Sequence, residues 1–279
     1  MSEQLENEMK IALIGQEQEP RVIRFNPKQY NVLLSVLKAV SKTCVDVIVS
    51  NGVIRNYDSH RKVFIEVDLS QYIGSNGWLA FPNASNKYKQ LKTLAKTKRT
   101  IEFIITDEKY IVRDVADSTV NISNSMSESQ IRYLSVPEKY LMCLPVNKSV
   151  YDPETTYKGN RIVEMQLEKI HIDRIKACRR HFGLDKVFIR FTKGKAEMVF
   201  ISRNRRRKKR DTMTRIRLTD TNPVYDGLVI DYPVQCFIYS NEETYFEIRD
   251  VDNMNVKHVL KTITTIKDTP IITWAIGEY

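Results

Sequence analysis

The sequence predicts an α+β protein of two similar domains, each with helices packed on antiparallel sheets. Three observations carry this prediction. An amphipathic helix followed by a run of short β-rich segments occurs twice in the first half of the chain, and the second half begins in the same way. Between the halves lies a segment, 126–160, that contains Pro137, Pro145 and Pro153 and is predicted to be an extended connector between the domains.

The first domain is predicted over 21–125, after a polar, Glu- and Gln-rich flexible arm at 1–20. A strand at 21–25 leads into a helix with Asn26 as N-cap and Pro27 at its first position. Apolar residues at three- and four-residue spacing predict that this helix ends at about residue 42. The other expected elements of this domain are strands at 45–50, 53–57 and 62–69, a helix at 84–97, and strands at 100–106, 110–115 and 119–122.

The second domain is predicted over 161–279, with a helix at about 167–182 that Gly183 ends. The strands expected to follow are 186–191, 196–202, 213–218, 228–231, 235–239 and 245–248, then a short helix at about 253–263 and a last strand at 271–276. Only that helix and the closing strand of the last quarter fit a further copy of the repeated unit.

The composition indicates a folded, basic, intracellular protein. Hydrophobic residues make up 42% of the chain, which allows a substantial core. The four cysteines form no CxxC pair, which argues against a disulfide framework and a zinc site. An acidic start and the absence of a long apolar run argue against a signal peptide or a membrane span. The net charge of +10 indicates either an anionic partner or a surface that is basic without a role in binding.

The placement of the cations favours duplex DNA. Lysine is also a good solvated helix residue, but ordinary exposed helices mix signs because like charges four residues apart are unfavourable. Side chains on acid-poor faces would contact phosphates without reading sequence. The candidates are Lys28, Lys38 and Lys42 on the first helix, Lys89, Lys92 and Lys96 on the second, Lys169, Lys176 and Arg180 on the third, and Lys257 and Lys261 on the fourth.

A separate basic run lies at 203–210, between two predicted strands, and is expected to be a protruding loop. Its candidate DNA contacts are Arg205, Arg206, Arg207 and Lys208. The alternatives are a nuclear-localisation patch, a site for an acidic partner protein, or a solvated loop.

No catalytic signature accompanies these charges. The chain has no GxxxxGK[ST] and no HExxH, and its four histidines have no recognisable catalytic spacing. Pairs such as Asp114 and Asp117 could hold a nuclease metal, but such pairs arise by chance in most sequences. We therefore expect no catalytic residues, no cofactor and no metal, and a protein that is not an enzyme.

The repeated plan, together with residues 91–117 (LKTLAKTKRTIEFIITDEKYIVRDVAD) and 174–202, resembles the DNA sliding clamps, above all the T-even phage type; the proliferating-cell nuclear antigen (PCNA) shares the plan. The resemblance implies a homotrimeric ring closed head to tail through edge strands, with inward helices around duplex DNA. It implies a DNA polymerase as partner and a separate ATP-driven loader. A partner pocket beside the connector would use Ile131, Tyr133, Leu134, Val136, Tyr140 and Leu141.

Two other functions remain open. A monomeric clamp-fold processivity factor would hold DNA by charge alone, and a viral transcription or recombination accessory protein would use the same basic faces. The expected location is the host cytoplasm or nucleoid for a phage protein, and the nucleus for the protein of a eukaryotic virus.

Overall fold

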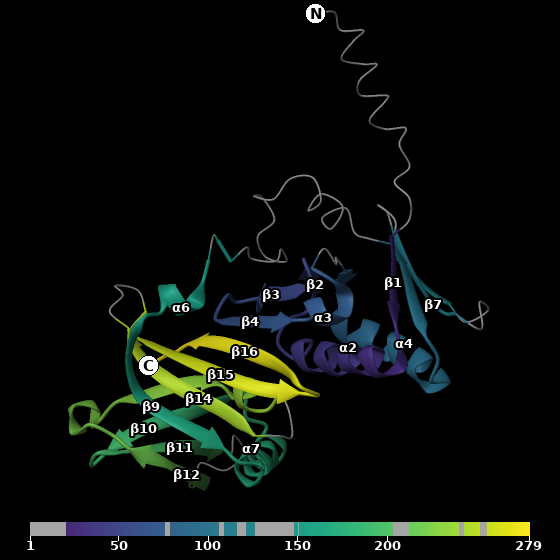
Figure 1. Cartoon of the computed structure of the whole chain (residues 1–279). Helices are drawn as coiled ribbons and strands as arrows, with labels where there is room; N and C mark the ends of the chain where they lie inside the picture. The colour runs from purple at the N-terminus through teal and green to yellow at the C-terminus, as the bar shows by residue number, and fades with distance from the viewer. Residues whose placement is uncertain are drawn as a thin grey trace, which may run out of the picture.

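The computed structural model describes residues 21–75, 79–105, 109–115, 121–125, 148–149, 151–202, 212–239, 243–251 and 256–279 (Figure 1). The expected arm at 1–20, most of the expected connector and the basic run at 203–210 lie outside these residues.

The first half of the chain contains three α-helices, one short 3-10 helix and eight strands among its described residues. In chain order these are β1 (Arg21–Phe25), α2 (Pro27–Val40), β2 (Val47–Ser50), β3 (Val53–Tyr57), β4 (Val63–Asp68), α3 (Ser70–Ile73), β5 (Leu79–Phe81), α4 (Ala84–Leu94), η1 (Ala95–Thr97), β6 (Ile101–Ile105), β7 (Lys109–Asp114) and β8 (Asn121–Ser125).

The second half follows the same order with a shorter second helical element. Its elements are α6 (Pro153–Thr156), β9 (Gly159–Leu167), α7 (Lys169–Phe182), β10 (Lys186–Thr192), β11 (Lys195–Ser202), β12 (Thr212–Asp220), η2 (Pro223–Tyr225), β13 (Val229–Pro233), η3 (Val234–Phe237), β14 (Thr244–Val251), β15 (His258–Ile266) and β16 (Thr269–Ile276).

The strand order is the same in both halves. Sheet β1-β6-β7-β8 corresponds to β9-β14-β15-β16, and sheet β5-β2-β3-β4 corresponds to β13-β10-β11-β12. One set from each half joins through antiparallel pairing of β4 with β16, where Val67 lies opposite Ile271, into an eight-stranded sheet that crosses the domain junction. The chain is therefore an α+β protein of two similar domains, as the sequence predicts.

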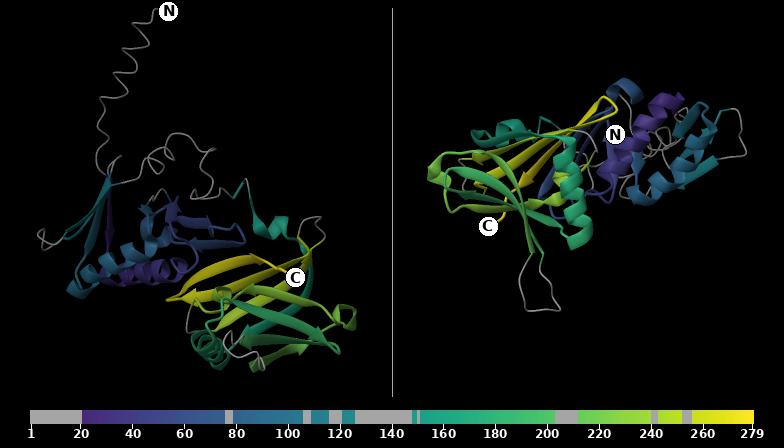
Figure 2. Two further views of the ribbon diagram at one scale, coloured as in Figure 1. Left: turned by 180° about the vertical axis from the view of Figure 1, so that it is seen from behind. Right: turned by 90° about the horizontal axis from the view of Figure 1, so that it is seen from below.

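The long helices lie on one side of the sheets. Seen from below, α2, α4 and α7 face the viewer (Figure 2). Asn26 and Gln29 form a capping box at the start of α2, and the hydroxyl of Tyr30 donates to the carbonyl of Leu91 at 2.8 Å, which fixes α2 against α4. Because strand side chains alternate between faces, Val63 and Ile65 of β4 pack toward these helices while Phe64 faces the opposite, outer side.

Two predictions in the last quarter are wrong. The helix expected at 253–263 is in its described part the strand β15, because Val259, Leu260 and Ile263 fit either period and β14 and β16 supply backbone partners on both sides. The strand expected at 235–239 is in its first part the short η3, whose residues are all buried. The elements that the sequence did not reveal are α3, β5, α6, η2 and β9.

Acid stability is expected to depend on Glu102, whose nearly inaccessible side chain accepts from Nε of Arg24 and of Arg113, both at 2.9 Å. The Arg24 hydrogen bond, opposed by burial and supported by Arg113, lowers the pKa of Glu102 below its ordinary 4.5. The stabilisation is therefore complete above pH 4.5 and disappears as the pH falls through the lowered value. E102Q should cost about 1–3 kcal/mol at neutral pH and flatten the acid side of a Tm profile.

The control for this prediction is E197Q, since Glu197 is more exposed and lies 3.7 Å from Arg215. It should change the profile little. Equal acid sensitivity of wild type and E102Q would refute the role of Glu102.

Candidate nucleic-acid interface

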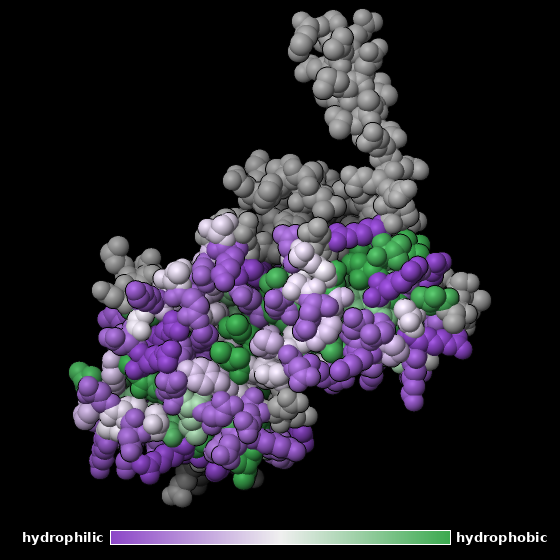
Figure 3. Space-filling view, in the orientation of Figure 1, coloured by the Kyte–Doolittle hydropathy of each residue, from purple (hydrophilic) through white to green (hydrophobic). Residues whose placement is uncertain are grey.

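Two neighbouring helices of the first domain present lysines to solvent. Neither α2 nor α4 contains an acidic residue. The predicted contacts Lys28, Lys38, Lys89, Lys92 and Lys96 are all exposed, as is Lys42 just beyond α2. Hydrophilic residues dominate the lower edge of the molecule, where these helices lie (Figure 3).

A groove of about 270 Å³ runs between α2 and α4. Its lining combines cations with uncharged hydrogen-bonding groups and a few apolar atoms, which suits a sugar-phosphate backbone better than a planar apolar ligand. The lining residues are Asn31, Leu34, Ser35, Lys38, Tyr88, Lys92, Ala95 and Lys96.

In the second domain, α7 carries the other predicted contacts. Ile172, Ile175 and Cys178 form its buried stripe, and Lys169 and Arg180 are exposed. Lys176 is half-buried, and this burial lowers its pKa, although nearby Asp173 opposes the shift. The structure thus places nine of the predicted cations on or beside three helices on one side of the sheets.

The structure separates the two remaining lysines from this set. Lys257 precedes β15 and Lys261 lies within it, so neither belongs to a helix. The ammonium group of Lys261 pairs with Glu154 and lies 4.9 Å from the ring centre of Trp274, on the outer face. The helix that grouped these two lysines with the other cations does not form, because the segment pairs with two neighbouring strands.

The other predicted contacts cannot be placed. Arg205, Arg206, Arg207 and Lys208 of the basic run lie outside the described residues, and so do the six residues of the predicted partner pocket, Ile131, Tyr133, Leu134, Val136, Tyr140 and Leu141.

The outer face carries a cluster that the sequence did not reveal. Phe64, Tyr157, Val251, Val259 and Trp274 form a second hydrophobic core, with Tyr57 and Tyr151 packed against it. These residues come from both domains and from the segment that precedes β9. Their aromatic character was visible in the sequence, but no local spacing links them.

Buried arginines join this outer cluster to the segment before β9. Arg55 donates to the carbonyl of Tyr151 at 2.6 Å, and Arg249 contacts Glu154 at 2.9 Å. The guanidinium groups of Arg55 and Arg249 lie over Phe64 and Trp274 respectively. This segment is therefore fixed across the outer face.

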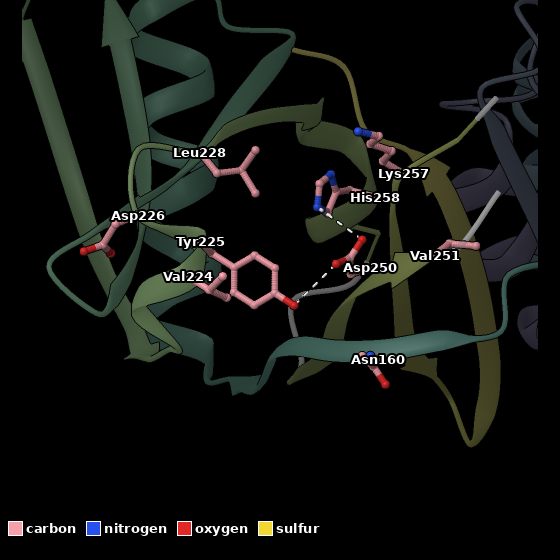
Figure 4. Close-up of a pocket in the computed structure, with 9 residues that line it drawn as sticks. All are labelled: Asn160, Val224, Tyr225, Asp226, Leu228, Asp250, Val251, Lys257 and His258. Atoms are coloured by element: carbon pink, nitrogen blue, oxygen red, sulfur yellow. Dashed lines mark hydrogen bonds and ion pairs between the residues drawn. The ribbon is translucent and has the colours of Figure 1, made fainter. Parts of the chain in front are cut away.

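A polar cleft of about 630 Å³ lies at one end of the second domain (Figure 4). Tyr225 and His258 both point toward Asp250, at 3.4 Å and 3.8 Å, and His258 also contacts the hydroxyl of Tyr279. Burial lowers the pKa of His258, Asp250 opposes this shift and Lys257 adds to it. Two hydrogen bonds, Tyr225 to Asp250 and His258 with Tyr279, thus lie side by side at the ends of β14 and β15.

The described residues contain no group of three or more His, Cys, Asp or Glu side chains placed to hold a metal ion. Among the described helices, none has the length and apolar character that crossing a membrane requires.

No protein-family model and no curated protein sequence matches the chain, but solved structures of similar fold exist. PCNA from Entamoeba histolytica is 8% identical, with a TM-score of 0.55 over 92% of this chain and 98% of that one. PCNA from A. fulgidus, solved with the C-terminal region of FEN-1, is 10% identical, with a TM-score of 0.53 over 92% and 98%. The β subunit of DNA polymerase III from Borrelia burgdorferi is 11% identical, with a TM-score of 0.59 over 93% and 64%. The strand order of this chain is repeated in both halves, one sheet crosses the domain junction, and the long helices lie on one side of the sheets. The chain therefore has the fold of the sliding clamps.

Proposed function

We propose that this protein is a sliding clamp that encircles duplex DNA and tethers a replicative DNA polymerase. The observation that carries the proposal is that the strands at two free sheet edges are the counterparts of the two strands that pair at the domain junction. Within the chain, β4 pairs with β16. Their counterparts, β12 and β8, are edge strands with no described strand on their outer sides. Pairing of β12 with β8 of another copy repeats the internal junction, and repetition of a head-to-tail contact closes a ring when the rotation fits.

The charge distribution supports DNA as the ligand of such a ring. Lysines on acid-free α2 and α4 and basic residues on α7 lie on one side of the sheets, which becomes the inner side if the ring closes as in the resemblance. Contacts of this kind neutralise phosphates and release counterions without selecting a sequence. The function is then topological, without a catalytic step, which fits a protein that is not an enzyme.

The partners follow from the same proposal. A closed ring needs a loader to open it, and the chain itself has no P-loop to supply ATP-driven work. The A. fulgidus PCNA was solved with the C-terminal region of FEN-1 bound, which supports docking of a partner's terminal segment as the means of recruiting a polymerase here. We retain the trimer, the T-even phage type, and the pocket near residues 131–141 as parts of this proposal.

Two measurements test the ring. The first is molar mass by light scattering at low and moderate salt over a range of concentrations, for which we expect three chains. The second compares retention on nicked circular DNA with retention on the same DNA after linearisation. A ring should stay on the circle at moderate salt and leave the linear molecule through its ends.

A monomer held by charge should instead leave both DNA molecules at the same salt concentration, because counterion release does not depend on topology. A stable monomer with equal retention on circular and linear DNA would therefore contradict the ring and favour the charge-held processivity factor.

A further inference from the structure

Cations from the two domains lie near one another at the domain junction. α2 ends beside the second domain, and Lys38 and Lys42 lie at this end. The charged groups that most influence Lys42 are Lys176, Lys38 and Arg179. Two of these belong to α7, so cations separated by more than 130 residues are close enough to interact electrostatically. We call Lys38, Lys42, Lys176 and Arg179 the junction cluster.

Two hydrogen bonds to the region of η3 fix this meeting. Thr43, next to Lys42, shares a 2.8 Å hydrogen bond with the buried hydroxyl of Tyr239, two residues beyond η3. On the other side, Nη1 of Arg179 donates to Oε1 of Gln235 in η3 at 2.6 Å. Both Tyr239 and Gln235 are buried, so the end of α2 and the last turns of α7 share one rigid support.

A difference between the two domains makes room for the junction cluster. In the first domain the segment between β5 and β6 forms α4, of 11 residues. In the described part of the corresponding segment of the second domain, between β13 and β14, the helical element is η3, of four residues. A full helix in this place would present its own exposed face. The short η3 instead supports side chains that come from α2 and α7.

Helix polarity accounts for only part of this charge. Cations near the C-terminal ends of helices are favourable, and Lys38 and Arg179 lie in last turns. Lys176 lies earlier in α7, and Lys42 lies beyond the end of α2, where it adds like-charge repulsion. Burial and the three neighbouring cations lower the pKa of Lys42 from 10.5 to about 8, although much of the residue is exposed. An anion placed among these groups relieves the repulsion.

We propose that the junction cluster is a phosphate-binding site that holds one position of the DNA backbone more firmly than the rest of the inner face. This inference rests on the proposed function, because it assigns DNA phosphate as the ligand. Arg179, fixed by Gln235, provides a directed donor, and the lysines surround the anion. The clamp then has one preferred contact in each chain instead of a uniform lining.

Binding at this site should take up a proton above neutral pH. Lys42 is partly deprotonated near pH 8 when free, and a bound phosphate favours its charged form. The affinity for a short duplex is therefore expected to fall about tenfold between pH 7 and pH 9, as the loss of one bound proton requires. K42R should remove this dependence while keeping the affinity at pH 7, since arginine stays charged throughout.

The test compares K42Q/K176Q with K28Q/K89Q, which removes two exposed lysines elsewhere on the same side. Fluorescence anisotropy with a short duplex should show a larger loss for the junction pair at pH 7, with a salt slope lower by about 2. Equal losses for the two pairs, or a pH dependence that persists in K42R, would refute a preferred site.

A second probe separates this inference from the proposed function. The side-chain carbon resonances of Lys42 and Lys28 are titrated with pH, with and without inorganic pyrophosphate. A rise in the pKa of Lys42 alone supports the site even if the wild type does not bind duplex DNA, in which case the clamp proposal fails. An unchanged pKa of Lys42 overturns the site even if duplex binding is normal.

Discussion

Reversal of three charges on α4 and the adjoining η1 is expected to abolish retention of the protein on circular DNA without unfolding it. Lys89, Lys92 and Lys96 are exposed, and two of them line the groove between α2 and α4. The triple variant K89E/K92E/K96E replaces three phosphate contacts with three repulsions. Because each contact contributes about one unit to the slope of log affinity against log salt, we expect a loss of roughly two to three orders of magnitude at moderate salt.

The measurement is the half-life on nicked circular DNA at several salt concentrations, together with a thermal unfolding curve. Exposed positions away from buried contacts change stability by at most about 0.5 kcal/mol each, so Tm should change little. A second comparison matches the number of reversed charges. The double variant K89E/K92E is measured beside the control K148E/K158E, which reverses two exposed charges flanking α6, away from α4. A half-life unaffected by the triple reversal would show that α4 does not face the DNA.

These lysines were accessible to sequence reasoning because their helices carry local signals. Asn26 and Pro27 mark the start of α2, and Gly183 adopts the left-handed conformation that ends α7. Such caps depend on neighbouring residues alone, and the first three predicted helices agree with the observed ones to within a few residues. Once a helix and its apolar stripe are known, its solvent face follows.

The failures occur where strand pairing or complete burial, and not the local pattern, decides the structure. The apolar spacing in β15 suits a helix, but pairing with β14 and β16 selects the strand. The apolar run at 234–239 is fully buried and so has no periodicity to read. Likewise β9 lacks a clear alternation, because three exposed residues begin it. Its partner strand is β14, where Thr244 lies opposite Leu167, so the residues that select this strand are distant along the chain.

The same distinction applies to the candidate site. Lys42 could be assigned to the first helix from sequence, but its approach to Lys176 depends on how the two domains join through β4 and β16. Lys261 was grouped with the DNA contacts because its partner, Glu154, lies 107 residues away. Single cations are therefore predictable from local pattern, whereas clusters and ion pairs follow from tertiary structure.

Loss of Arg249 is expected to have the largest effect on stability, because this buried side chain joins β14 to the segment before β9. Its Nε donates to Glu247 at 2.6 Å, its other nitrogens contact Glu154 and the carbonyl of Tyr157, and its charge lies 5.0 Å from the ring centre of Trp274. R249M leaves Glu247, which is 1% exposed, with a carboxylate that has lost its buried partner. Breaking a buried ion pair in this way costs about 3–5 kcal/mol.

Chemical denaturation measures this cost, and the matched control is R161M. Arg161 contacts the same Glu247 at 3.0 Å from an exposed position, so its loss should cost much less than the loss of Arg249. The double variant E247Q/R249M should recover part of the R249M loss, because it removes the stranded charge. Hydrogen exchange at the amides of Thr156 and Tyr157, which close α6, should accelerate in R249M and not in R161M. Equal costs for R249M and R161M would mean that Arg249 compensates Glu247 no better than the exposed Arg161 does, and that the contacts of Arg249 do not hold the segment before β9.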